Sequence, residues 1–106
     1  MPHGEGAAAR QLIADMYGCC SSVLNDPDTL KETAHQAVRM IGAEIVEECV
    51  HRFSPVGITY FAVITTSHFS IHTWPELGYA AVDIFSCSAD VPECVAQFLK
   101  SAFRSS

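Results

Sequence analysis

Reactive side chains are concentrated between Thr65 and Cys87, in the sequence TTSHFSIHTWPELGYAAVDIFSC. The polar and reactive members of this stretch include Ser67, His68, Ser70, His72, Trp74, Glu76, Asp83 and Cys87. A serine beside a histidine can form a nucleophile and base, but the chain lacks a G-x-S-x-G motif, and such a pair alone indicates hydrolysis only weakly. His68 and His72 have a spacing that suits a metal site on a helix, whereas this segment is predicted to be a strand. We therefore predict no metal site.

The first half of the chain predicts two strands separated by a helix. Residues 10–17 are predicted to form a strand. Asp26 followed by Pro27 is typical of a helix N-cap and first turn, and apolar residues then recur at helical spacing over 27–41. Residues 43–53 follow as a second strand.

Three more strands are predicted in the second half. In residues 58–65 apolar residues occur at both the odd and the even positions, so both faces of a strand there would carry apolar side chains. This pattern is typical of a central strand covered on both faces. A short strand at 68–73, a turn at Trp74-Pro75-Glu76 and a strand at 79–86 come next.

A helix is predicted to close the chain. Asp90 and Glu93 are spaced as a capping box at its start. Its apolar stripe is predicted to consist of Val91, Cys94, Val95, Phe98 and Ala102.

The element order β-α-β-β-β-β-α predicts an α+β fold, a two-layer α/β sandwich with a mainly antiparallel sheet and helices on one face. We expect one domain spanning residues 1–106. The other face of the sheet is then left open or covered by a second copy of the chain.

The composition of the chain argues against several classes of protein. A net charge of −6 argues against a nucleic-acid-binding protein, and no apolar segment approaches the length of a membrane span. The N-terminal residues contain no signal-peptide core, and the five cysteines contain no C-x-x-C pair. We therefore expect a cytoplasmic protein with reduced thiols.

The segment SHFSIHTWPELGYAAVDIFSC resembles the signature of the bacterial S-adenosylmethionine decarboxylase proenzymes of the short, single-domain type. The similarity continues upstream through HRFSPVGIT at 51–59 and, more loosely, to the strand ending at Tyr17 and to LNDPDTL. It covers roughly residues 10–103. An ordered motif of this length is much more specific than any of its residues taken singly.

The resemblance implies that the chain makes its own covalent cofactor, a pyruvoyl group, from Ser67. The Ser67 hydroxyl attacks the carbonyl of Thr66, and the chain is cleaved into a β chain, 1–66, and an α chain, 67–106. Thr59 stands where a hydroxyl supports this processing.

Two further residues have roles that the resemblance implies. His72 accepts the α-proton of residue 67, a task that suits an imidazole at neutral pH. The pyruvoyl carbonyl forms a Schiff base with the substrate amine, and Cys87 returns a proton during decarboxylation. The product is the aminopropyl donor for spermidine and polyamine biosynthesis.

The resemblance also implies the substrate site. Phe53 stacks with the adenine of S-adenosylmethionine, Trp74 is a second candidate platform for it, and Glu76 accepts hydrogen bonds from the ribose hydroxyls. Family sites lie at the interface of a homodimer of processed protomers. Asp83, although inside the motif, is assigned a structural role.

Two positions depart from the family pattern, in which glutamate is common at the position of Thr66 and histidine at that of Gln11. The chain also ends sooner than many relatives, at Ser106. These differences keep two alternatives open. One is a pyruvoyl-dependent decarboxylase of arginine or ornithine, and the other is a regulatory paralogue that is not processed.

Overall fold

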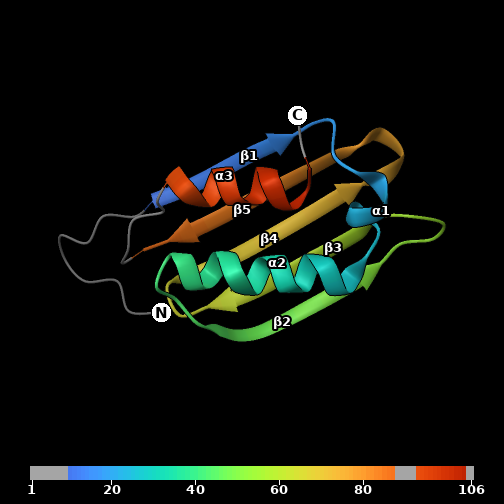
Figure 1. Cartoon of the computed structure of the whole chain (residues 1–106). Helices are drawn as coiled ribbons and strands as arrows, with labels where there is room; N and C mark the ends of the chain where they lie inside the picture. Colours follow the sequence, from blue (N-terminus) through green and yellow to red (C-terminus); the bar gives the residue numbers. More distant parts are fainter. Residues whose placement is uncertain (1–9, 88–92, 105–106) are drawn as a thin grey trace.

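The computed structural model describes residues 10–87 and 93–104. Its elements are β1 (Arg10–Met16), α1 (Ser21–Leu24), α2 (Pro27–Met40), β2 (Ile45–Arg52), β3 (Ile58–Ile64), β4 (Ser67–Trp74), the 3₁₀ helix η1 (Pro75–Leu77), β5 (Tyr79–Ser86) and α3 (Glu93–Ala102). The five strands form one antiparallel sheet in the order β1-β5-β4-β3-β2, and α2 and α3 lie across one of its faces (Figure 1). The predicted α+β sandwich with helices on one face is confirmed.

Helix α2 begins where the sequence predicts. The Asp26 carboxylate accepts hydrogen bonds from the backbone N–H groups of Asp28 and Thr29, and Pro27 occupies the first turn, where its missing N–H costs nothing. Hydrogen bonds from the Thr29 side chain and backbone lower the pKa of Asp26. The helix ends at Met40, one residue before the predicted end.

The core lies between the helices and the alternate strand residues that face them. Tyr60, Phe69, Ile71 and Ile84 on the sheet are fully buried. On α3 and just beyond it, Val95, Leu99 and Phe103 are fully buried as well, at a spacing of four residues. The predicted stripe of α3 was therefore partly wrong: Cys94 is exposed, while Leu99 and Phe103 were missed. Val91 and the Asp90 end of the predicted capping box lie outside the described residues.

The central strand is β4, and the prediction that residues 58–65 form a central strand covered on both faces was wrong. Strand β3 is next to the edge strand β2, and only its helix-facing residues are buried. On the other face, Phe61 and Val63 are each 42% exposed. The helices cover one face only, so among residues 10–87 and 93–104 nothing packs over the apolar side chains of the open face.

The remaining strand ends differ from the prediction by one or two residues, and β2 carries a register shift between Ile45 and Glu47. Helix α1 was not predicted; it has only four residues and no periodic signal. Of the described helices, none is long and apolar enough to cross a bilayer, and the longest, α2, has 14 residues.

Loops at one end of the sheet are tied together by α1 and the residue that follows it. The Asn25 side chain accepts a hydrogen bond of 3.1 Å from the backbone N–H of Gly57, in the β2–β3 turn. Gly57 has a φ of +110°, and a Cβ placed there would lie 3.3 Å from the carbonyl oxygen of Thr73. Only glycine fits both demands without strain. The turn is therefore held close against the end of β4.

Candidate active site

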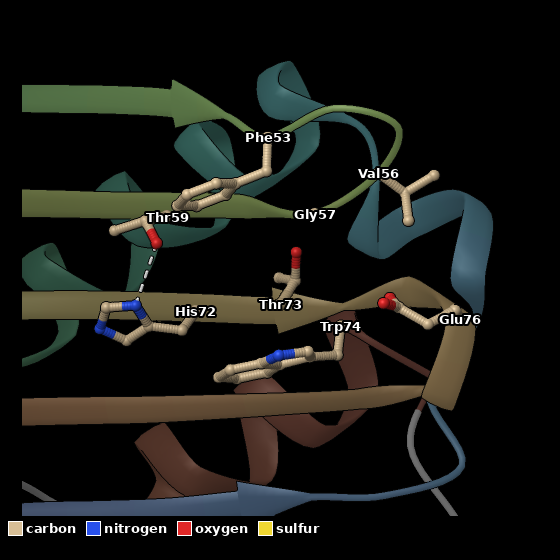
Figure 2. Close-up of a pocket in the computed structure, with 8 residues that line it drawn as sticks. All are labelled: Phe53, Val56, Gly57, Thr59, His72, Thr73, Trp74 and Glu76. Carbon is tan, nitrogen blue, oxygen red and sulfur yellow. Dashed lines mark hydrogen bonds between the residues drawn. The ribbon is translucent and has the colours of Figure 1, made fainter.

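A cleft of about 330 Å³ opens at this end of the sheet, between the β2–β3 turn and the end of β4. Its lining consists of Phe53, Val56, Gly57, Thr59, His72, Thr73, Trp74 and Glu76 (Figure 2). Five of these are predicted site residues: Phe53, Thr59, His72, Trp74 and Glu76. The structure brings them together from three segments of the chain.

Thr59 and His72 are directly opposite each other on β3 and β4. The Thr59 hydroxyl and His72 Nδ1 are 3.0 Å apart and form a hydrogen bond (Figure 2). Successive strand residues point to opposite faces, and the buried neighbours of this pair, Ile58 and Ile71, face the helices. Thr59 and His72 therefore lie on the open face, where the hydroxyl fixes the orientation of the imidazole.

Two aromatic rings and a carboxylate border the same cleft. The side chains of Phe53 and Trp74 are 52% and 41% exposed, and Glu76 is exposed on η1. Trp74 is supported from behind by Tyr79, with ring centroids 5.2 Å apart. Tyr79 donates a hydrogen bond of 2.5 Å to Asp15, and this bond raises the pKa of Tyr79 to about 12. The indole is thus held in place while one part of it stays open to a ligand.

The other predicted site residues lie at the opposite end of β4. Ser67 begins the strand with a φ of 156°, at the edge of the region that L residues avoid. The carbonyl oxygen of the preceding residue, Thr66, accepts a hydrogen bond of 2.9 Å from the backbone N–H of Cys87. Thr66 and Cys87 are both buried, at 8% and 2% exposure. The Thr66–Ser67 peptide is therefore strained, shielded from water and polarised at its carbonyl.

The site residues thus form two groups. The serine group is Thr66, Ser67 and Cys87, and the cleft group is Phe53, Thr59, His72, Trp74 and Glu76. Ser67 and His72 are five residues apart on one extended strand, which separates their Cα atoms by about 17 Å. The chain does not bring its serine group and its cleft group into contact.

Two polar residues near Ser67 were missed or assigned no functional role. His68 Nδ1 lies 3.4 Å from Ser67 Oγ, and His68 Nε2 lies 3.4 Å from the carboxylate of Asp83. Asp83, which was assigned a structural role, also accepts a hydrogen bond of 2.9 Å from the Gln11 side chain. The pairing of His68 with Asp83 could have been anticipated only from the strand register, which the sequence does not state.

Comparison with known proteins identifies the family. The sequence matches the S-adenosylmethionine decarboxylase family over residues 10–106. It is 46% identical over 99 residues to an S-adenosylmethionine decarboxylase proenzyme of Moorella thermoacetica, covering 92% of this chain and 79% of that protein. A proenzyme of the same name from Carboxydothermus hydrogenoformans is 49% identical over 85 residues, covering 80% and 67% of the two chains.

A solved structure agrees with this result. The crystal structure of the adenosylmethionine decarboxylase from Aquifex aeolicus superimposes with a TM-score of 0.83 at 25% identity, covering 93% of this chain and 82% of that one. Sequence and fold therefore lead to the same conclusion. The chain belongs to the S-adenosylmethionine decarboxylase family.

Proposed function

We propose that this chain is a proenzyme that cleaves itself between Thr66 and Ser67 and then decarboxylates S-adenosylmethionine. The main support for self-cleavage is the hydrogen bond from the Cys87 N–H to the Thr66 carbonyl. A backbone donor already aimed at a carbonyl stabilises the negative charge that develops when a nucleophile attacks it. The φ of Ser67 adds strain on the order of 1–3 kcal/mol, which cleavage of the peptide releases.

Cleavage begins when the Ser67 hydroxyl adds to the Thr66 carbonyl and the C–N bond breaks, which replaces the amide with an ester. A base then removes the α-proton of residue 67, and elimination releases the Thr66 carboxylate as the end of the β chain, 1–66. The dehydroalanine left at residue 67 takes up water and loses ammonia, which gives a pyruvoyl group at the start of the α chain, 67–106. That group supplies the electron sink for loss of carbon dioxide.

His72 is the base of the elimination step in this proposal, and Thr59 holds its imidazole through the 3.0 Å hydrogen bond. A general base must lie within about 3 Å of the proton that it removes. Within one chain His72 and Ser67 are about 17 Å apart along β4. The serine group of one protomer must therefore meet the cleft group of another.

A homodimer that pairs the open faces of two sheets satisfies this requirement. The open face exposes Ile13, Phe61 and Val63, at 68%, 42% and 42%. Burying such side chains is favourable, and a two-fold axis would complete two equivalent sites at once. Each site would combine Ser67 and Cys87 of one protomer with the cleft group of its partner.

Cys87 is the proton donor in this proposal. It is buried, and its backbone N–H contacts the carbonyl of the residue before Ser67. In this role its thiol returns a proton to the substrate carbon after carbon dioxide leaves. Its burial keeps the thiol itself away from bulk water.

The cleft group suits a nucleoside with a positive charge. Phe53 and Trp74 offer aromatic faces to an adenine ring or a sulfonium cation, and Glu76 can accept hydrogen bonds from the two ribose hydroxyls. Arginine and ornithine have neither a purine nor a ribose. S-adenosylmethionine is therefore the substrate that uses all three side chains.

The test is release of labelled carbon dioxide from carboxyl-labelled S-adenosylmethionine, arginine and ornithine, each supplied alone to purified protein. We expect release from S-adenosylmethionine only. Release from arginine or ornithine alone would overturn the substrate assignment and retain the chemistry. No release from any of the three, with an uncleaved chain, would favour a regulatory paralogue.

A further inference from the structure

His68 lies in a confined position on the open face of the sheet. Its imidazole is sandwiched between the rings of Phe61 and Phe85, with centroid distances of 5.8 Å on both sides and interplanar angles of 20° and 16°. Its two ring nitrogens point to different partners, Ser67 Oγ at Nδ1 and Asp83 Oδ2 at Nε2, each at 3.4 Å. The two phenyl rings leave the imidazole little freedom to rotate out of this plane.

The partners determine the tautomer of His68. An ionised carboxylate only accepts hydrogen bonds, so the Asp83 side of the ring carries the N–H. Nδ1 then presents its lone pair to the Ser67 hydroxyl. The Gln11 side chain donates to the second oxygen of Asp83 at 2.9 Å and holds the carboxylate in place. Nucleophile, base and orienting carboxylate thus stand in the order found in hydroxyl nucleophiles that are activated by a neighbouring histidine.

We propose that His68 is the general base of the first step of self-cleavage, a role that rests on the proposed processing at Ser67. His68 Nδ1 takes the proton from Ser67 Oγ as that oxygen bonds to the Thr66 carbonyl carbon. The carbonyl electron pair moves onto oxygen, where the Cys87 N–H stabilises it. When the C–N bond breaks, His68 returns the proton to the departing amine, so the step consumes no other reactant.

In this proposal His68 and His72 act as bases in two different steps. His68 acts in cis on the hydroxyl of its own chain, which its contact distance allows. His72 is about 17 Å from Ser67 along the strand and acts on the α-proton after the ester has formed. Asp83 is a positioning residue, because it acts only through the ring of His68.

A second histidine–carboxylate pair provides a matched control. His35 Nε2 lies 2.8 Å from Glu48, on the helix side of the sheet and away from Ser67. The side chains of His35 and His68 are exposed to a similar extent, 34% and 32%. A change at His35 therefore removes the same kind of pair without touching the serine group.

The experiment follows the appearance of fragments 1–66 and 67–106 after cell-free synthesis, with and without hydroxylamine, which cleaves esters. The full-length chains are wild type, His68→Asn, Asp83→Asn, His72→Ala, His35→Asn and Ser67→Ala. His68→Asn keeps a polar atom near the position of Nδ1 but cannot take the proton. We expect its cleavage to be at least about 100-fold slower than in wild type, because general bases contribute about 10²–10⁴ in rate.

Each variant should stop at a different step of processing, and hydroxylamine shows whether the ester has formed. Uncleaved His68→Asn and Asp83→Asn chains should resist hydroxylamine, because no ester forms, whereas His72→Ala chains should be cleaved by it. His35→Asn should process as wild type. Wild-type cleavage of His68→Asn, or equal slowing of His35→Asn, would overturn the proposal. If His68→Asn does not fold, wild-type cleavage of Asp83→Asn would overturn it instead. Cleavage of Ser67→Ala would overturn the proposed function itself, which distinguishes the two failures.

Discussion

Ser67 and His72 lie on the same strand, β4, but near its opposite ends. Five residues of extended chain separate them, so their Cα atoms are about 17 Å apart. Ser67 shares its end with the Thr66 carbonyl and Cys87, whereas His72 shares the other end with Thr59 and the aromatic cleft. The proposed reaction needs both residues, and this separation is the reason why we propose that each site forms between two copies of the chain.

Complementation between inactive chains tests this arrangement. Ser67→Ala and His72→Ala should each be uncleaved alone, but in a mixed dimer the intact His72 of one chain meets the intact Ser67 of the other. Random pairing restores about one quarter of the sites. Mass spectrometry should show that every fragment 67–106 carries the His72→Ala change.

A second pairing serves as the control. Ser67→Ala with Cys87→Ala should not regain decarboxylase activity, because both changes affect the serine group. Activity in this pair equal to that of the first pair would contradict the division into two groups.

Cys87 should matter more for turnover than for cleavage. In Cys87→Ala the backbone N–H that contacts the Thr66 carbonyl is retained, so fragments 1–66 and 67–106 should still form. The proton donor is lost, and we expect decarboxylation to fall by about 10²–10⁴. Gel analysis of the fragments and labelled carbon dioxide release measure the two effects separately. Wild-type turnover would remove Cys87 from the donor role.

The Phe53 ring should contribute to nucleoside binding. Loss of one aromatic stacking partner costs about 1–3 kcal/mol, so Phe53→Ala should weaken S-adenosylmethionine binding about 5- to 150-fold. Self-cleavage should be nearly unchanged, because the ring contacts none of the serine group within its own chain. Val46→Ala is the control: Val46 is an exposed apolar residue on β2 outside the cleft lining, and this variant should bind as wild type. Equal affinities of all three proteins, measured calorimetrically, would exclude Phe53 from the site.

Glu48 makes the stability of the fold depend on pH. Burial opposes ionisation, but hydrogen bonds from Tyr60 at 2.6 Å and His35 at 2.8 Å, with Lys31 at 3.3 Å, lower the pKa of Glu48 in the folded state. A carboxyl group with a lowered pKa stabilises the fold above its ordinary pKa of 4.5, and this contribution is lost as the pH falls below that value.

Glu48→Gln should therefore reduce the free energy of unfolding by about 1–2 kcal/mol at pH 7, and the difference from wild type should shrink on acidification. Urea denaturation between pH 7 and pH 3 measures this. The exposed Glu44→Gln is the control. A difference that stays constant over the whole range would contradict the assignment.

Local features of the fold were predictable, and its long-range pairings were not. The Asp26-Pro27 signal located α2, and alternation located the strands to within one or two residues. Alternation tells which residues share a face but not which strands are neighbours, and so β3 was wrongly placed at the centre of the sheet. Helix α1 is too short to carry a periodic signal.

In the site, too, local features were predictable and contacts between strands were not. The SIHTWPE motif drew attention to His72, Trp74 and Glu76, and the structure brings these three together in one cleft. The motif alone did not show that Ser67 lies away from that cleft, because the position of the cleft depends on how β2, β3 and β4 are paired. The contact of His68 with Asp83 likewise depends on the pairing of β4 with β5.

The most direct test of the account is the intact mass of the purified protein under denaturing conditions. We predict two species, fragment 1–66 and fragment 67–106, with the second lighter by one ammonia than a chain that starts with serine. The Ser67→Ala variant should give one full-length species. A single full-length mass for the wild-type chain, or cleavage of Ser67→Ala at the same bond, would contradict it.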